Sequence, residues 1–476
     1  MKMSCRETGP GYRSPFDAMR GPRETLMYVT CIQPNGTRDC KSDYLATIDV
    51  DPNSSQFCQV ICRTLVPYFG DELHHSGWNS CSSCFNDMTK CRNRLICATL
   101  NSDRIYVFDM TSLKQPKLFK VIQSQEMHRN RVSSGHTSHC LPSNEIMISC
   151  MGDEKRNNKG SFILLDGNSF NIKGNWNLGD NNSSQFGYDF WYQTRHNVMI
   201  SSEWGSPNTF NKGFKLEDVS NNLYGHSIHV WNWTTKQCIQ TIDLGSDGVM
   251  PLEIRFLHNP ISCEGFVGCA LSSTVFRFFK SNDKWLTQKV ISIATKKVNN
   301  WLLPEMPALI TDILVSLDDR YLYISLWLFG EVRQYDISVT SKPVLVGKCL
   351  FGGSLCNDGL VFVINSQEPE VEPNGQRERV LVKNKVIKGG PQMLQLSLDG
   401  HRLYITNSLY SVWDKQFYPD MVDQGSAMLM IDVDTQKGGL NLNKNFLVDF
   451  GKEEFGPVLA HEMRYPGGDC TSDIWI

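Results

Sequence analysis

The sequence predicts an all-β fold, a seven-bladed β-propeller formed by residues 1–476 as a single domain. Three observations lead to this prediction. Short β-rich runs recur along the whole chain, two of them belong to a weak internal repeat, and the runs group at intervals of roughly 50 to 60 residues, a spacing that suits four-stranded blades with long loops.

The runs are rich in β-branched and aromatic residues, and clusters of Gly, Asn, Asp and Ser separate them. This combination is typical of antiparallel strands. In chain order the runs cover residues 44–50, 104–109, 145–149, 160–166, 197–201, 229–233, 321–325, 332–336, 402–406 and 427–433. Long helical periodicity is nearly absent, so we expect few helices.

The repeat relates residues 314–325 to residues 394–406. Each copy has the pattern of a strand, an Asp-Asp or Asp-Gly turn and a second strand, and a strand that ends in Asp follows. Such a unit is typical of a propeller blade. Candidate blade centres fall near residues 50, 105, 155, 215, 270, 325 and 415.

Two stacked sandwiches or a set of separate β domains are the alternative architectures. Both need a Pro/Gly/Ser-rich linker between cores, and none is evident. We interpret the stretches near 205–225 and 353–390 as long loops inserted in the propeller, and residues 1–25 as a polar N-terminal extension. Strands from both ends often complete one blade, and residues 44–50 and 473–476 are candidates for that closure.

Composition restricts the partners and the location that we expect. The net charge is −3 and no Lys/Arg-rich run occurs, so nothing favours binding to nucleic acid or to an anionic membrane. We expect no integral membrane segment, because no apolar stretch reaches about 18 residues. The first 25 residues lack the apolar core of a secretory signal, which favours the cytosol. The 17 cysteines are then expected to be mostly reduced.

Histidines gather in two short segments. The chain has 11 histidines, and four of them belong to a His-His pair at 74–75 and a His-x-x-His pair at 136–139. A propeller brings the first strands of its blades around one channel, so histidines distant in sequence converge there, in a nitrogen-rich site that suits copper, iron or zinc. The candidate ligands are His74, His75, His136, His139, His258 and His461. The carboxylates expected to orient them are Asp71, Glu253 and Glu462.

The pair Cys81-Ser-Ser-Cys84 has two readings that the sequence leaves open. It is a redox or metal-binding pair, or it is two reduced structural thiols. A structural zinc site usually takes a second pair with matching spacing, and a thioredoxin-like site needs a βαβ context, and neither is found. The chain also lacks a Gly-rich nucleotide fingerprint and a Gly-x-Ser-x-Gly elbow, which argues against kinases and hydrolases.

Long motifs resemble those of one known family. The sequence resembles the selenium-binding protein 1 family, also called methanethiol oxidase, from about residue 9 to the C-terminus. The segments that carry the resemblance are 72–84, 136–139, 187–192, 251–258, 301–307 and 459–476. Motifs of this length are specific.

The resemblance implies a β-propeller that oxidises methanethiol with O2 and water to formaldehyde, hydrogen sulfide and hydrogen peroxide. It also implies copper dependence and a mainly cytosolic location. The family's selenium-attachment position matches Cys58, and all six candidate histidines match. Some relatives carry a histidine where this chain has Phe329, so no ligand is carried over to that turn.

Three functional hypotheses follow. The first is a copper-dependent methanethiol oxidase whose partners are a small thiol and O2, with a catalytic proton acceptor that the sequence does not identify. The second is a non-catalytic propeller scaffold that binds selenium at Cys58 or senses redox state, and that has protein partners. The third is a scaffold stabilised by zinc. Consumption of more than one equivalent of thiol per chain distinguishes the first from the second.

Overall fold

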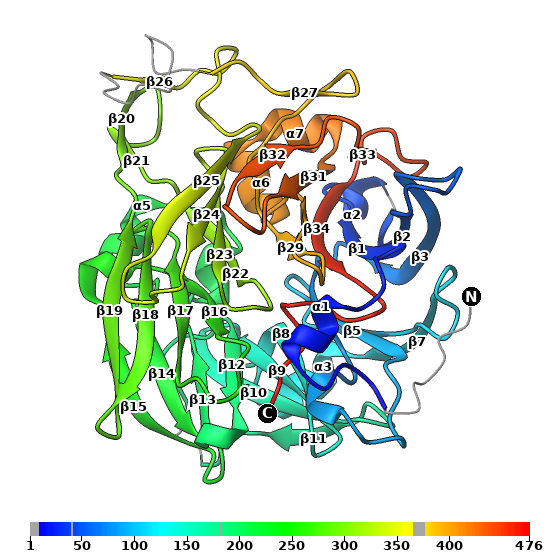
Figure 1. Cartoon of the computed structure of the whole chain (residues 1–476), viewed down its shortest axis with the longest axis vertical. Helices are drawn as coiled ribbons and strands as arrows, with labels where there is room; N and C mark the ends of the chain where they lie inside the picture. Colours follow the sequence, from blue (N-terminus) through cyan, green and yellow to red (C-terminus); the bar gives the residue numbers. More distant parts are fainter. Residues whose placement is uncertain (1–8, 40, 180–182, 365–376) are drawn as a thin grey trace.

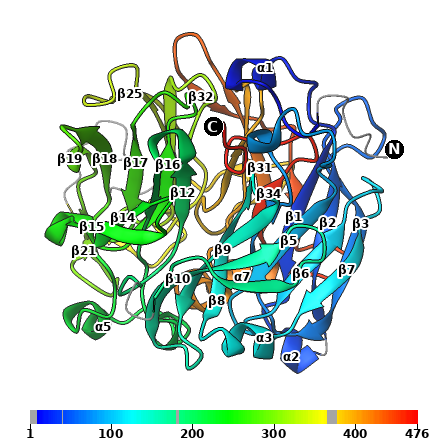
Figure 2. The ribbon, with the colours of Figure 1, turned by 90° about the horizontal axis from the view of Figure 1, so that it is seen from below.

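The computed structural model describes residues 9–39, 41–179, 183–364 and 377–476, and the fold is all-β (Figure 1). Among these residues, six antiparallel sheets have four strands and a further one has five. Figure 2 shows the first sheets, in blue and cyan, on one side of the molecule and the sheets of residues 190–292, in green, on the other. This arrangement confirms the predicted class and resembles a propeller.

The first sheet joins the two ends of the chain. Its strands, in the order β3-β2-β1-β34, are β1 (Leu26–Ile32), β2 (Ser42–Asp49), β3 (Gln59–Phe69) and β34 (Leu459–Arg464). The chain is therefore closed by β34, which pairs antiparallel with β1. Residues 44–50 belong to this sheet as expected, but residues 473–476 form no strand. Residues 473–475 are buried beside the N-terminal segment, where the Trp475 indole donates a hydrogen bond to the Tyr12 carbonyl (3.0 Å).

The remaining large sheets follow one another along the chain, each with its strands in sequence order. The second to fourth consist of β4 (Leu73–Trp78), β5 (Arg94–Thr99), β6 (Ile105–Asp109), β7 (Lys117–Ile122), then β8 (Ser133–Leu141), β9 (Glu145–Gly152), β10 (Asn158–Asp166), β11 (Ile172–Asn175), then β12 (Phe190–Gln193), β13 (Val198–Ser201), β14 (Ser227–Asn232), β15 (Gln237–Asp243). The others consist of β16 (Pro251–Phe256), β17 (Glu264–Cys269), β18 (Thr274–Ser281), β19 (Lys284–Ser292), then β22 (Ile310–Val315), β23 (Tyr321–Leu326), β24 (Glu331–Asp336), β25 (Val344–Leu350), then β29 (Leu394–Leu396), β30 (Arg402–Ile405), β31 (Ala427–Val433), β32 (Leu440–Leu442) and β33 (Val448–Asp449).

The inner strands of these sheets contact each other in a circle. β34 contacts β4, β4 contacts β8, β12 contacts β16, β16 contacts β22, β22 contacts β29, and β29 contacts β34 again. β8 and β12 are joined by the Tyr192 hydroxyl, which donates to the Cys140 carbonyl (2.6 Å). Every residue of these inner strands is buried, whereas the outer strand β15 alternates exposed and half-buried residues. Polar side chains on the inner strands are therefore brought together at the centre, away from water.

The internal repeat corresponds to two equivalent hairpins, β22–β23 and β29–β30. In each turn a serine hydroxyl donates to the following aspartate, from Ser316 to Asp318 (2.5 Å) and from Ser397 to Asp399 (2.6 Å). The next residue, Asp319 or Gly400, has a positive φ (57° and 78°). Asp and Gly tolerate this left-handed conformation, which explains why the two copies read Asp-Asp and Asp-Gly.

The predicted insertions fall between strands. Residues 205–225 connect β13 to β14, and residues 353–390 connect β25 to β29, with 365–376 outside the described residues. The latter connection holds β26 (Phe362–Val363), β27 (Leu381–Val382) and β28 (Lys385–Val386), and β26 joins β20 (Lys296–Asn299) and β21 (Glu305–Met306) in a small sheet.

Helices are short and lie in connections. They are α1 (Pro15–Met19), α2 (Gly36–Asp39), α3 (Ser124–Arg129), α4 (Pro207–Phe210), α5 (Leu216–Ser220), α6 (Ser411–Phe417) and α7 (Pro419–Gln424), with 3₁₀ turns η1 (Ser82–Cys84), η2 (Thr194–His196) and η3 (Gly245–Gly248). None of the helices in the described part of the chain has the length and apolarity needed to span a membrane.

Residues 1–25 are predicted to be a polar extension. Residues 1–8 lie outside the described residues, but 9–12 are buried against the sheets. A Cβ added to Gly11 would lie 2.4 Å from the Ser82 Cα, so this segment packs closely on η1. Residues 9–12 of the predicted extension are therefore part of the packed structure, whereas most of residues 13–25 are exposed or half-buried.

Candidate metal centre

Inner strands of three neighbouring sheets carry four buried histidines. β4 provides His74 and His75, β8 provides His136, and β34 provides His461. Consecutive strand residues normally point to opposite faces. The register of β4 against β5 shifts between Leu73 and Ser76, however, and this irregularity lets both His74 and His75 face the cluster.

Gly77 allows β4 and β8 to approach closely. A Cβ at this position would lie 2.2 Å from the Ser138 carbonyl oxygen of β8, far inside van der Waals contact. The glycine is thus required by the distance between the two strands. That distance in turn brings His75 of β4 next to His136 of β8.

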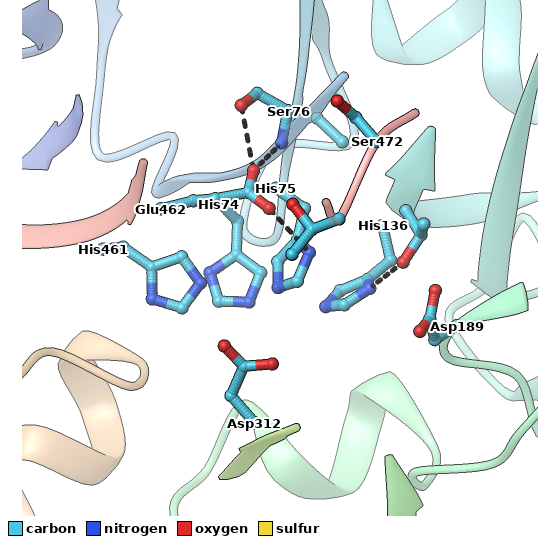
Figure 3. A network of polar contacts seen from close by, with 12 residues as sticks. His74, His75, Ser76, His136, Asp189, Asp312, His461, Glu462 and Ser472 are labelled. Carbon is cyan, nitrogen blue, oxygen red and sulfur yellow. Dashed lines mark hydrogen bonds and ion pairs between the residues drawn. The ribbon is translucent and has the colours of Figure 1, made fainter. Parts of the chain in front are cut away.

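The four rings form one compact group, the histidine cluster (Figure 3). The ring centroids of His74 and His461 lie 3.8 Å apart, and those of His75 and His136 lie 3.9 Å apart. The His74 centroid is 4.9 Å from that of His75. One nitrogen from each of His74, His75 and His136 lies within 4.8 Å of the others, a spacing that can hold a metal ion.

Polar contacts orient three of these rings. The Nδ1 atom of His461 donates to the Ser408 carbonyl (2.8 Å), that of His136 contacts the Thr137 hydroxyl (3.1 Å), and that of His75 lies 3.4 Å from Glu462 Oε1. The Nε2 atoms of these three rings, His75, His136 and His461, are buried and have no hydrogen-bond partner in the described structure. The same is true of Nδ1 of His74. Buried polar atoms are normally satisfied, so four unsatisfied nitrogens in one place indicate a ligand.

Burial keeps the cluster uncharged. It lowers the pKa of His136 to about 3 and that of His461 to about 4. Burial and the neighbouring rings lower the pKa of His74 and His75 well below the ordinary value. Neutral imidazoles present free electron pairs at neutral pH, which is what copper and zinc require of nitrogen ligands.

Glu462 supports the cluster from β34. It accepts hydrogen bonds from the Ser76 backbone and from the Ser76 hydroxyl (2.9 Å), and it pairs with the buried Arg464 (2.5 Å). Burial raises the pKa of Glu462 to about 7, although Arg464 acts in the opposite direction. An acid that holds the Nδ1–H of His75 directs Nε2 toward the centre of the cluster.

The carboxyl group of Asp312 and the phenol of Tyr188 lie beside the cluster. Figure 3 shows the Asp312 carboxyl group pointing toward the His74 and His75 rings. Its Oδ2 atom accepts a hydrogen bond from the Leu394 backbone (2.7 Å), whereas Oδ1 has no hydrogen-bond partner in the described structure. Burial raises the pKa of Asp312 to about 7. The ring of Tyr188 lies 4.0 Å from that of His136.

A small cavity begins at His74. Apart from His74, Tyr188 and Thr311, its lining is apolar and includes Trp204, Leu252 and Leu309. A space of this kind beside the histidines accepts a small apolar group and excludes bulk water.

The other two predicted histidine ligands lie outside the cluster. His139 also belongs to β8, but its ring contacts Phe190 and Trp191 edge-on, with centroids 5.1 Å away in both cases. His258 follows β16, donates from Nε2 to the Val315 carbonyl (3.0 Å) and packs against Trp475. Both nitrogens of His139 and Nδ1 of His258 are nevertheless buried without a partner, so their predicted role as ligands stays open.

Of the three predicted supporting carboxylates, Glu462 contacts the cluster. Asp71 instead pairs with Arg104 (2.7 Å) and accepts a hydrogen bond from the Tyr106 hydroxyl. Glu253 pairs with Arg255 (2.6 Å). Arg255 also binds Asp189 (2.6 Å), so these groups form a buried ion-pair network in the channel.

The predicted thiols occupy two other places. Cys58 follows β2 with a positive φ of 67°, and burial raises its pKa. Cys81 precedes η1 and Cys84 is its last residue, and the Ser83 hydroxyl lies 3.3 Å from the Cys81 sulfur and 3.8 Å from the Cys84 sulfur. The same hydroxyl lies 3.9 Å from the sulfur of Cys140, which the sequence reasoning did not include.

Asp312, Tyr188 and Arg464 were also not predicted from the sequence. Tyr188 lies within the motif 187–192 that carries the family resemblance, and Arg464 lies within 459–476, so their motifs were noted without a role for these residues. Asp312 lies in a run of β-forming residues, and nothing in that run distinguishes it as a functional residue.

Curated proteins resemble the chain over its whole length. A curated methanethiol oxidase of Xenopus laevis is 59% identical over 475 residues, which cover 99% of both chains. The human protein called methanethiol oxidase is 57% identical over 479 residues, and so is a mouse protein called selenium-binding protein 2, with full coverage of both chains in each case.

A solved structure has the same fold. The X-ray structure of a hypothetical selenium-binding protein from Sulfolobus tokodaii matches with a TM-score of 0.84 and 38% identity, and covers 98% of each chain. A periplasmic gluconolactonase of Pseudomonas aeruginosa, only 10% identical at a TM-score of 0.55, shares the fold alone. Residues 6–476 match the family model described as 56kDa selenium binding protein. The chain therefore belongs to the selenium-binding protein family.

Proposed function

We propose that this chain is a methanethiol oxidase that converts methanethiol, O2 and water to formaldehyde, hydrogen sulfide and hydrogen peroxide. Full-length relatives at 57–59% identity that carry this name support the proposal. The structural observation that carries it is the histidine cluster, with four buried nitrogens that lack a partner.

We propose copper as the metal, bound by His74, His75, His136 and His461. The donor set fits, since all four rings are neutral and buried, nitrogens of His74, His75 and His136 lie within 4.8 Å of one another, and the His461 ring stacks on that of His74. Copper bound there would supply the redox chemistry, taking electrons from the thiol and passing them to O2. Glu462 and Arg464 would fix the His75 ring through the contacts described above.

The remaining steps are assigned to the residues around the cluster. The apolar wall of Trp204, Leu252 and Leu309 would hold the methyl group and keep water away from it. Asp312 Oδ1 would accept a proton from the substrate, because this oxygen has no hydrogen-bond partner and its group has a pKa of about 7. These residues would therefore contact the methyl group and accept the proton of a small thiol bound beside the histidines.

The blade count belongs to the same proposal. We assign the six four-stranded sheets and the five-stranded sheet as seven blades around the channel. The circle of contacts between inner strands supports this assignment. A single domain and a cytosolic location stay predictions from the sequence.

Substitution of the histidines tests the ligand set. His136→Ala and His461→Ala should each lose copper and sulfide production, whereas His139→Ala and His258→Ala should keep both. Copper content by mass spectrometry and sulfide release from methanethiol in air are the two measurements. Undiminished copper and activity in both cluster variants would rule out the assignment.

The selenium-binding scaffold is the second candidate, favoured by the name of the mouse relative and by the matching position of Cys58. It predicts that the protein binds selenium through Cys58 and consumes at most one equivalent of thiol. A zinc-stabilised scaffold would instead hold one zinc ion that is released only on unfolding.

A further inference from the structure

A second reactive cluster lies between η1 and β8, away from the histidines. It consists of the thiols of Cys81, Cys84 and Cys140, which surround the hydroxyl of Ser83 at 3.3, 3.8 and 3.9 Å. The three sulfurs are thus neighbours around one hydroxyl. All three cysteines are reduced and buried.

A lysine distinguishes Cys84 from the other two. The ammonium group of Lys90 lies 3.6 Å from the Cys84 sulfur and donates to the Pro142 carbonyl (2.9 Å). The hydrogen bond from Cys140, together with Lys90, lowers the pKa of Cys84 to about 6 against the opposing effect of burial. Burial raises the pKa of Cys140 well above the ordinary value. Cys84 is therefore the thiolate of the pair, and Cys140 is a protonated neighbour.

A polar cavity opens at the surface beside Lys90, next to this cluster. Its volume is about 640 Å³, and its lining includes Lys90, Ser80 and Pro142. Cys84 is 4% exposed, compared with 1% for Cys81 and 2% for Cys140. Lys90 lines this cavity and contacts the Cys84 sulfur, so Lys90 connects the cavity to Cys84.

We propose that Cys84 and Cys140 form a peroxide-reactive thiol pair, with Cys84 as the attacking sulfur and Cys140 as the resolving one. The peroxide is the product of the proposed oxidase reaction, and on this point the inference rests on the proposed function. This pair joins η1 to β8 and differs from Cys81 and Cys84, whose role as a redox pair stays a prediction from the sequence.

The chemistry balances with hydrogen peroxide as the oxidant. The Cys84 thiolate attacks the O–O bond, an S–O bond forms, and the leaving hydroxide takes a proton to become water, leaving a sulfenic acid. The Cys140 sulfur then attacks the Cys84 sulfur, an S–S bond forms, and the S–O bond breaks with release of a second water that carries the Cys140 proton. Two thiols lose two electrons, and one peroxide becomes two waters.

The test adds hydrogen peroxide directly to the reduced full-length protein, without methanethiol. After alkylation and digestion, mass spectrometry should find peptides that join Cys84 to Cys140. Cys140→Ser should accumulate a sulfenic acid at Cys84 that dimedone traps, and Cys84→Ser should lose the cross-link. Cys81→Ser is the matched control in the same cluster and should keep the cross-link.

Lys90→Met tests the activation separately from the cysteines. It should slow oxidation of Cys84 at least tenfold near neutral pH and move the midpoint of its pH profile upward from about 6 toward 9, the value of an ordinary thiol. A cross-link between Cys81 and Cys84, or oxidation of Cys84 no faster than that of the buried Cys269, would overturn the proposal. A cross-link that forms with added peroxide but not with methanethiol and O2 leaves this proposal standing and counts against the oxidase.

Discussion

Glu462→Gln should weaken metal binding while the fold survives. The substitution keeps an oxygen that accepts the hydrogen bonds from Ser76 but removes the negative charge shared by His75 and Arg464. Loss of a partner that orients a ligating histidine typically reduces metal affinity about 10- to 100-fold. This corresponds to about 1.4–2.8 kcal/mol, since each tenfold change is about 1.4 kcal/mol.

The same substitution should also reduce stability. Arg464 is buried, and its other hydrogen-bond acceptors are the neutral oxygens of Ser76, Met463 and Thr471. An uncompensated buried charge costs about 3–5 kcal/mol, and we expect the lower end because the glutamine oxygen remains a hydrogen-bond acceptor for Arg464. Glu145→Gln is the matched control, since Glu145 pairs with the exposed Lys173 and such pairs contribute about 0–1 kcal/mol.

Two assays separate these effects. Competition with a chromophoric chelator gives the copper affinity of each variant, and urea unfolding of the metal-free protein gives the free energy of unfolding. A folded Glu462→Gln variant that binds copper as tightly as the wild type would refute the role assigned to Glu462. Equal stability losses in Glu462→Gln and Glu145→Gln would refute the argument from burial.

Three further predictions concern packing and pH. Gly77→Ala places a methyl group against the Ser138 carbonyl. It should lower the free energy of unfolding in urea by about 1–3 kcal/mol and should also lower the copper content. Wild-type values for both would contradict the close approach of β4 and β8. Leu459→Ala in the buried closing strand should lower the free energy of unfolding by about 2–5 kcal/mol, whereas Ile261→Ala at a site that is 70% exposed should change it little. Equal losses in the two variants would contradict the closure by β34. Burial raises the pKa of Glu72 from 4.5 to about 8, so the folded protein retains a proton that the unfolded chain has lost, and stability should fall as pH rises through this range. The histidines of the cluster oppose this fall only below about pH 6.5, because their pKa values are lowered. Between pH 6.5 and 8 the raised pKa values of Glu462 and Asp312 add to the fall, and the lowered pKa of Cys84 opposes it. The unfolding free energy of metal-free protein should therefore decrease more in the wild type than in Glu72→Gln over this range, and equal profiles in the two proteins would contradict the raised pKa of Glu72.

The fold was largely predictable because its signals are local. β-rich runs, turn residues and the repeat at 314–325 and 394–406 depend on neighbouring residues, and all three reappear in the sheets. Closure was not predictable in detail. Residues 459–464 and 473–476 are both short and apolar in part, and only the pairing of β34 with β1 decides between them.

The candidate site was predictable in residue type but not in geometry. The sequence indicated histidines that converge on a channel, and four of the six meet there. His139 was grouped with His136 by spacing, yet its ring packs among Phe190 and Trp191. Asp312 and Cys140 gain their roles only from side chains that lie far away in sequence, so no local pattern could identify them.

The most direct test of the central claim is sulfide release from methanethiol in air by protein that has been stripped of metal and reloaded. We expect sustained release, many equivalents per chain, with copper in the wild type, and none in metal-free protein or in His136→Ala. Absence of turnover with copper in the folded wild type would contradict the proposed oxidase and favour the selenium-binding scaffold.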